Sequence, residues 1–125
     1  MGGNVVARGD DIQERLIQFA ARIIKVCDVL PRSRAGRHIA GQLLRSGTSA
    51  APNHGEARGA ESTADFIHKL KIGVKELNES EVWMRIIIAS DMMSQNELAQ
   101  LLDECRQLQR ILNASIKTAR QSTKI

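Results

Sequence analysis

The side chains best placed to do chemistry are charged residues that recur on otherwise apolar helical faces. In the predicted helix that follows Ser62, Glu76 and Glu79 share a face with Trp83. Upstream, Arg45 recurs in helical register with other polar residues, on the stripe Arg45, Ser49, Asn53 and Glu56. Charges on apolar faces are costly unless they are paired and hydrogen-bonded. The spacing therefore predicts a polar network between two helices.

This network has three candidate roles. It fixes the register of the helices, it joins subunits, or it forms a metal or catalytic carboxylate cluster. Its predicted members are Arg45, Asn53, Glu56, Asp65, Glu76, Glu79 and Trp83. Di-metal bundle sites require a Glu-x-x-His motif on two helices, and only Asp65-x-x-His68 approaches that motif. The structural role is favoured, the network is expected to be buried, and neither a metal nor another cofactor is expected.

Other catalytic motifs are incomplete in this sequence. His54-x-Glu56 lacks the P-C-x-x-C partner of zinc deaminases, and no Ser, Cys or Thr stands in a nucleophile elbow. Arg32 and His38 in RSRAGRH loosely match the Arg and His spacing of some helical-bundle ribonucleases. The sequence predicts a protein that is not an enzyme, with ribonuclease chemistry at these two residues as the catalytic alternative.

A basic segment offers a second candidate site. Residues 32–45 contain four arginines and no acid, within a chain of net charge +4. Arg32, Arg34 and Arg37 are candidates for contacts to RNA or DNA phosphates, and the alternative is a solvated surface. The chain has no Tyr, two Phe and one Trp, which argues against binding single strands by base stacking.

Apolar spacing predicts four helices and no strand. The first begins at Asp10 or Asp11 and ends before Pro31, because proline disfavours a helical residue before it. The second runs from about Ser33 to Gly59, and the third and fourth follow capping patterns at 62–65 and 94–97. Apolar or small residues three and four apart mark three faces: Ile12, Leu16, Phe19, Ile23, Val26 and Leu30; Phe66, Leu70, Gly73, Leu77, Ser80, Met84 and Ile87; and Leu98, Leu101, Cys105, Leu108, Leu112, Ser115 and Ala119.

The second helix carries most of the helix-weakening residues. Pro52 predicts a kink, because it removes a backbone donor and presses on the carbonyl four residues earlier. Glycine and alanine recur on several faces at positions 40, 47, 50, 51, 55, 57, 59 and 60. Such a segment gains its stability from packing on more than one side.

These elements predict an all-α, up-down antiparallel four-helix bundle with a Pro-kinked second helix. One domain is expected over residues 10–121, with flexible termini at 1–9 and 122–125. Cys27 and Cys105 lie on apolar stripes and are expected to be buried free thiols. No signal peptide or membrane span is recognisable, so a cytoplasmic protein is expected.

Over about residues 12–120 the chain resembles the bacterial "four helix bundle protein" family, which includes the large-subunit rRNA intervening-sequence proteins. More distantly it resembles the accessory variability determinant protein of diversity-generating retroelements. The resemblance rests on LLRSGTSAAPNHGEARGAES followed by ADFIHKLKIGVKELNESEVWMRII. The matching positions are Arg45, Asn53, Glu56, Ser62, Asp65, Phe66, Glu76, Glu79 and Trp83. His54 departs from the apolar or aromatic residue that is usual in the family.

The resemblance implies a ring, commonly a homopentamer with a central channel, and no established enzymatic activity. The retroelement relative binds nucleic acid and cooperates with a reverse transcriptase, which makes such a protein an implied partner. A ring would repeat Arg32, Arg34 and Arg37 as a basic rim able to bind phosphate backbones. The leading hypothesis is a homo-oligomeric, non-catalytic protein that binds RNA or DNA. The alternative is a structural or protein-interaction module without nucleic-acid binding.

Overall fold

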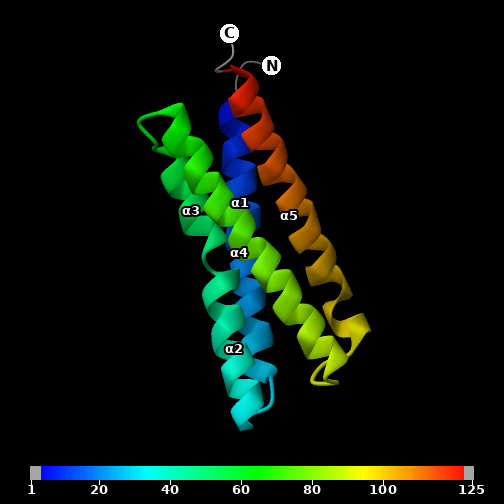
Figure 1. The fold of residues 1–125 in the computed structure, drawn as a ribbon. Coiled ribbons are helices and arrows are strands. Elements are labelled where there is room, and N and C mark those ends of the chain that lie inside the picture. The colour runs from blue at the N-terminus through cyan, green and yellow to red at the C-terminus, as the bar shows by residue number, and fades with distance from the viewer. Residues whose placement is uncertain (1–3, 123–125) are drawn as a thin grey trace.

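The computed structural model describes residues 4–122, which form an up-down bundle of α-helices (Figure 1). The helices are α1 (Asn4–Val29), α2 (Arg34–Gly47), α3 (Ala50–Arg58), α4 (Thr63–Ala89) and α5 (Gln95–Ser122). Helices α2 and α3 continue in one direction and are called here the α2–α3 arm. With α1, α4 and α5 this arm makes the four antiparallel arms predicted from the sequence, and no strand occurs in residues 4–122.

The first helix begins earlier than its sequence pattern predicts. Helix α1 starts at Asn4, so Asp10 and Asp11 lie within it and do not cap it. Residues 4–9 of the expected N-terminal tail are helical, and Ser122 of the expected C-terminal tail is the last residue of α5. The rest of both tails lies outside the described residues. Helix α1 ends at Val29, in agreement with the predicted effect of Pro31.

Serine side chains begin three of the helices. Ser33 Oγ and Ser62 Oγ each accept a backbone N–H three residues further on, at 3.1 and 3.0 Å. Ser94 and Glu97 form a reciprocal capping box, because each side chain accepts the other's backbone N–H, at 3.2 and 2.9 Å. These caps confirm the predicted starts of α2, α4 and α5.

The second predicted helix is interrupted at Thr48 and Ser49, not simply kinked at Pro52. Pro52 cannot donate to the Thr48 carbonyl, so an uninterrupted helix would lack that bond. As the third residue of α3, Pro52 stands where a backbone N–H has no partner within the helix anyway. The hydroxyls of Thr48 and Ser49 donate hydrogen bonds to backbone carbonyls of the preceding turn. The distances are 2.7 Å to the Leu44 oxygen and 2.6 Å to the Arg45 oxygen.

The core follows the predicted apolar faces closely. Every predicted core position of α4 from Leu70 to Ile87 is buried, whereas Phe66 is half-buried. On α5, Ile116 is buried where the sequence analysis proposed its half-buried neighbour Ser115. The largest fully buried side chains are Leu16, Phe19, Ile23, Leu43, Leu70, Leu77, Met84, Ile87, Leu98, Leu108 and Leu112.

At the end of the bundle opposite the start of α1 and the end of α5, the α1–α2 connection lies apart from the α4–α5 turn (Figure 1). This end is called here the open end. The surface of that open end carries the arginines singled out in the sequence. No helix within residues 4–122 combines the length and apolar character that crossing a membrane requires.

Candidate functional site

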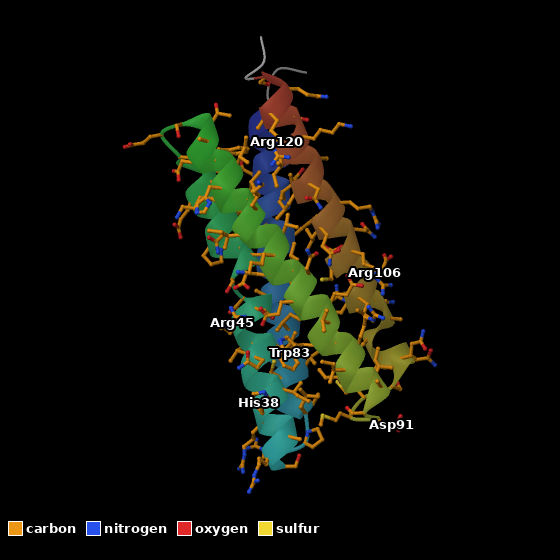
Figure 2. The ribbon with its side chains drawn as sticks, in the orientation of Figure 1. His38, Arg45, Trp83, Asp91, Arg106 and Arg120 are labelled. Atoms are coloured by element: carbon orange, nitrogen blue, oxygen red, sulfur yellow. The ribbon has the colours of Figure 1, made fainter. Side chains whose placement is uncertain are left out.

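A polar cluster occupies the seam between α2 and α4. Arg45 Nη1 donates to Glu76 Oε2 at 2.7 Å, and Arg45 Nη2 donates to Glu79 Oε2. Trp83 Nε1 donates to the same Glu79 oxygen at 3.1 Å. The His38 ring meets Trp83 edge to face, with centroids 6.0 Å apart. These five residues are called the Arg45 cluster, and Figure 2 shows His38, Arg45 and Trp83 along the seam.

The Arg45 cluster is shielded on the α4 side and open on the α2 side. The Glu76 side chain is 11% exposed, whereas that of Arg45 is 50% exposed. Hydrogen bonds from Arg45, and then from Trp83, lower the pKa of Glu79. The bond to Glu79, followed by that to Glu76, raises the pKa of Arg45. The predicted burial of the network therefore holds for Glu76 and not for Arg45. Because water screens the exposed guanidinium, breaking the Arg45–Glu76 pair costs less than breaking a fully buried pair.

The other predicted members of the network lie elsewhere. Asn53 Nδ2 donates to the Ser49 carbonyl at 2.9 Å, within the α2–α3 arm. Glu56 accepts from Lys69 Nζ at 2.9 Å and joins α3 to α4 as an exposed pair. Asp65 lies in the first turn of α4, where its backbone N–H bonds to the Ser62 cap. The sequence pattern therefore identified two polar seams and a cap as one network.

The thiols are poorly suited to chemistry. Burial raises the pKa of Cys27 to about 11 and that of Cys105 to about 12, so both stay protonated near neutral pH. Cys105 is buried as predicted, whereas Cys27 is half-buried. Each donates to a backbone carbonyl, at 3.3 Å to Ala40 and 3.2 Å to Leu77. Within residues 4–122, no group of three His, Cys, Asp or Glu side chains is arranged to hold a metal ion.

Three exposed arginines stand at the open end of the bundle, and we call them the basic tip. Arg32 lies in the α1–α2 connection, and Arg34 and Arg37 lie in the first turn of α2. Within the described part of the chain, no ion pair includes any of the three. The chain has no acid from residue 29 to residue 55. The basic tip thus carries uncompensated positive charge.

The candidate ribonuclease pair is not joined in this structure. His38 turns toward Trp83, and no hydrogen bond between Arg32 and His38 occurs in the part of the chain that the structure describes. Arg32 precedes α2, whereas His38 lies more than one turn into it. The two side chains thus belong to different surroundings, the basic tip and the Arg45 cluster.

A buried histidine between α1 and α3 was not singled out from the sequence as part of a site. His54 is 6% exposed, and its Nδ1 lies 2.6 Å from Gln13 Oε1. Gln13 Nε2 in turn donates to the Ala51 carbonyl at 3.2 Å. Burial, and secondarily the charge of Arg58, lowers the pKa of His54. Its spacing from Ala50 and Ala57, both buried, was the available signal.

The protein is an up-down helical bundle with a polar cluster in the α2–α4 seam and a group of exposed arginines at one end. The chain belongs to the 23S rRNA-intervening sequence protein family, whose model matches residues 10–114. This finding confirms the family proposed from the sequence.

One solved structure supports the same assignment. It is a crystal structure of a protein of unknown function from the S23 ribosomal protein family of Bacteroides thetaiotaomicron. The two chains are 31% identical, and the match covers 87% of this chain and 97% of that one, with a TM-score of 0.82. No protein of curated function matches this chain significantly.

Proposed function

We propose that this protein is a non-catalytic, self-associating helical bundle that binds the phosphate backbone of structured RNA through its basic tip. The observation that carries the proposal is the exposed, unpaired arginine group at the open end of the bundle. Membership of a family described by an rRNA intervening sequence makes RNA the first nucleic acid to test. A cytoplasmic location belongs to the same proposal.

The local geometry of the basic tip suits phosphate binding. Arg34 and Arg37 are three residues apart on one helix, so their side chains are neighbours. They begin α2, whose first backbone N–H groups and helix dipole also favour an anion. Guanidinium groups bind phosphate oxygens in a bidentate manner. Contacts of this kind give affinity that depends on salt and carries little sequence information.

Self-association is supported by apolar side chains that one copy leaves in water. Among the side chains that the structure describes, six large hydrophobic ones are at least 38% exposed: Ile17, Ile24, Val29, Leu44, Val82 and Ile86. They are distributed over three helices, α1, α2 and α4. We propose that copies cover one another at these positions, in a homopentameric ring of the kind the family resemblance implies. Such a ring would present the basic tip five times.

The alternative function is a protein-interaction module that binds no nucleic acid. The same exposed apolar residues favour it, because a partner protein could cover them instead of a second copy. The distant retroelement resemblance implies a reverse transcriptase as one such partner. The two functions differ in whether Arg32, Arg34 and Arg37 matter for binding.

A filter-binding titration with structured RNA tests the proposal. Three phosphate contacts per complex predict that affinity falls roughly 40-fold when salt rises from about 50 to about 200 mM. The variant Arg32/Arg34/Arg37→Ala is expected to lose most of this affinity and most of this salt dependence. The RNA should remain intact on a gel, whereas cleavage that is lost in His38→Ala would identify a ribonuclease.

A matched control removes the same charge elsewhere. Lys71, Arg110 and Lys117 are exposed on α4 and α5, and their replacement by Ala should leave most of the affinity. Equal losses in both triple variants would show attraction by net charge alone. Absence of binding by the wild-type protein at about 50 mM salt would overturn the proposal, because phosphate contacts are strongest at low salt.

A further inference from the structure

An apolar groove runs along the outer side of the α4–α5 pair. It has a volume of about 640 Å³ and is lined by both helices. Val82, 51% exposed, and Ile86, 38% exposed, contribute from α4, and Leu102 contributes from α5. Arg85 and Arg106 are the charged residues of the lining. Arg106 is paired with Glu81 at 3.1 Å, whereas no ion pair of the described residues includes Arg85. An occupant of this groove should be apolar, with an acidic group near Arg85.

Helix α1 carries a surface with those properties. Ile17 and Ile24 are 42% and 44% exposed, and they lie seven residues apart on one face. Glu14 and Asp28 are exposed close to this face. At 100° per residue both acids lie nearer to the Ile17–Ile24 stripe than Lys25 does. The stripe is therefore apolar in its middle and acidic toward its ends.

We infer that the Ile17–Ile24 stripe of one copy docks in the α4–α5 groove of the next copy. The inference rests on the self-association proposed above and names the surfaces that meet. The lengths agree, because seven residues of helix span roughly 10.5 Å in the stripe and also from Val82 to Ala89 in the groove. The charges are opposite, because Glu14 and Asp28 lie beside the stripe and Arg85, which is in no ion pair of the described residues, lines the groove. Docking would cover exposed side chains on both copies.

The contact joins two different surfaces, so it is heterologous. Within one copy α1 packs on α2, α3 and α5, and none of the residues that line the groove belongs to α1. Each copy would therefore offer its stripe to one neighbour and its groove to another. Contacts of this type close into rings when the rotation between neighbours permits. An isologous dimer would instead pair one surface with itself.

Two single substitutions at exposed positions disrupt the two docking surfaces one at a time. Ile17→Glu places an unmatched charge in the stripe, and Val82→Glu places an acid in the groove opposite Glu14 and Asp28. Each variant alone is expected to be monomeric by light scattering, at concentrations where the wild-type protein associates. Thr118→Glu, on an exposed position of α5 outside both surfaces, should associate like wild type. Far-ultraviolet circular dichroism confirms that the helices are retained.

Mixing the two disrupted variants gives the decisive result. The Val82→Glu copy keeps an intact stripe and the Ile17→Glu copy keeps an intact groove, so a 1:1 complex should form and grow no further. No association in the mixture, or unchanged association of either single variant, would overturn the inference. The milder variants Ile17→Ser and Val82→Ser, which should weaken association at least tenfold, repeat the test if a Glu variant loses helicity. A wild-type protein that stays monomeric at all concentrations would instead refute self-association itself.

Discussion

Two of the interruptions between helices differ in kind: Thr48–Ser49 separates α2 from α3, and the turn at Asp91 separates α4 from α5. Thr48 and Ser49 keep negative φ angles, −102° and −89°, and α3 continues in the direction of α2. Asp91 has φ of 61°, and the chain reverses from α4 into α5 (Figures 1 and 2). The first interruption alters hydrogen bonding while preserving direction. The second alters direction, and at Asp91 it does so through the left-handed backbone region.

Different contacts hold the two interruptions. At the turn, the N–H groups of Asp91 and Met92 bond to the carbonyls of Ile88 and Ile87, both at 3.0 Å, which is a Schellman motif. At the break, the local hydrogen bonds of Thr48 and Ser49 are joined by contacts with other helices, including Gly47 against Ile23, Ser46 with Ser80 at 2.8 Å, and Arg45 with Glu76. The turn is therefore specified locally, whereas the break also depends on tertiary packing.

The largest expected effect is at the break, where α2 meets α1. A Cβ on Gly47 would lie 2.6 Å from Ile23 Cγ2, and Ile23 is a fully buried, β-branched side chain that cannot move away. We expect Gly47→Ala to lower the free energy of unfolding by about 1 to 3 kcal/mol. Urea denaturation at fixed protein concentration measures it.

Gly41 provides the matched control within the same helix. A Cβ there meets no atom within 4 Å. Gly41→Ala should therefore stabilise the protein by about 0.5 to 1 kcal/mol, because alanine favours the helix more than glycine does. If both substitutions stabilised the protein, the packing of α1 against the break would not restrict the size of the side chain at residue 47.

A smaller loss is expected from the α4 side of the break. Glu76→Ala removes a shielded carboxylate that accepts from Arg45, and we expect a loss of about 1 to 2 kcal/mol. Glu56→Ala breaks the exposed pair with Lys69 and should give no measurable change. Thermal unfolding of both variants provides the measurement. Equal melting temperatures would show that the Arg45 cluster does not hold the seam.

The α3 side of the break should make stability depend on pH. Burial lowers the pKa of His54 from 6.5, so the unfolded chain binds this proton more readily than the folded one. Stability should be fully present above pH 6.5 and should fall as the pH drops through the folded-state pKa. In His54→Gln this part of the pH dependence should disappear.

The control for this pH effect is His68→Gln, at an exposed position of α4. It should keep the wild-type fall in stability between neutral and mildly acidic pH. Denaturant midpoints measured across this range compare the three proteins. An identical pH profile in wild type and His54→Gln would show that His54 does not contribute to the pH dependence of stability.

Features that depend on nearby residues could be predicted from the sequence, whereas features that depend on packing between helices could not. Capping at Ser62 and Ser94 and the buried face of α4 follow from nearby residues, and the structure confirms them. The break could not be placed from Pro52 alone, because its position depends on packing around Gly47. The pairing of Arg45 with Glu76 and Glu79 joins helices whose register no local pattern fixes, so Asn53 and Glu56 were grouped with them wrongly. The α4–α5 groove likewise requires the relative placement of two helices.

The smallest expected effect is a gain in stability at the turn. Asp91 holds a left-handed conformation that glycine adopts without a Cβ penalty. Asp91→Gly should therefore stabilise the protein by about 0.5 to 1 kcal/mol. Ser90→Gly, at the neighbouring residue with φ of −91°, should destabilise it by at least a similar amount, because it adds backbone freedom there and removes the hydrogen bond from Ser90 Oγ to the Ile87 carbonyl. Chemical denaturation distinguishes the two signs, and a loss in Asp91→Gly would mean that the Asp91 side chain, not its backbone, specifies the turn.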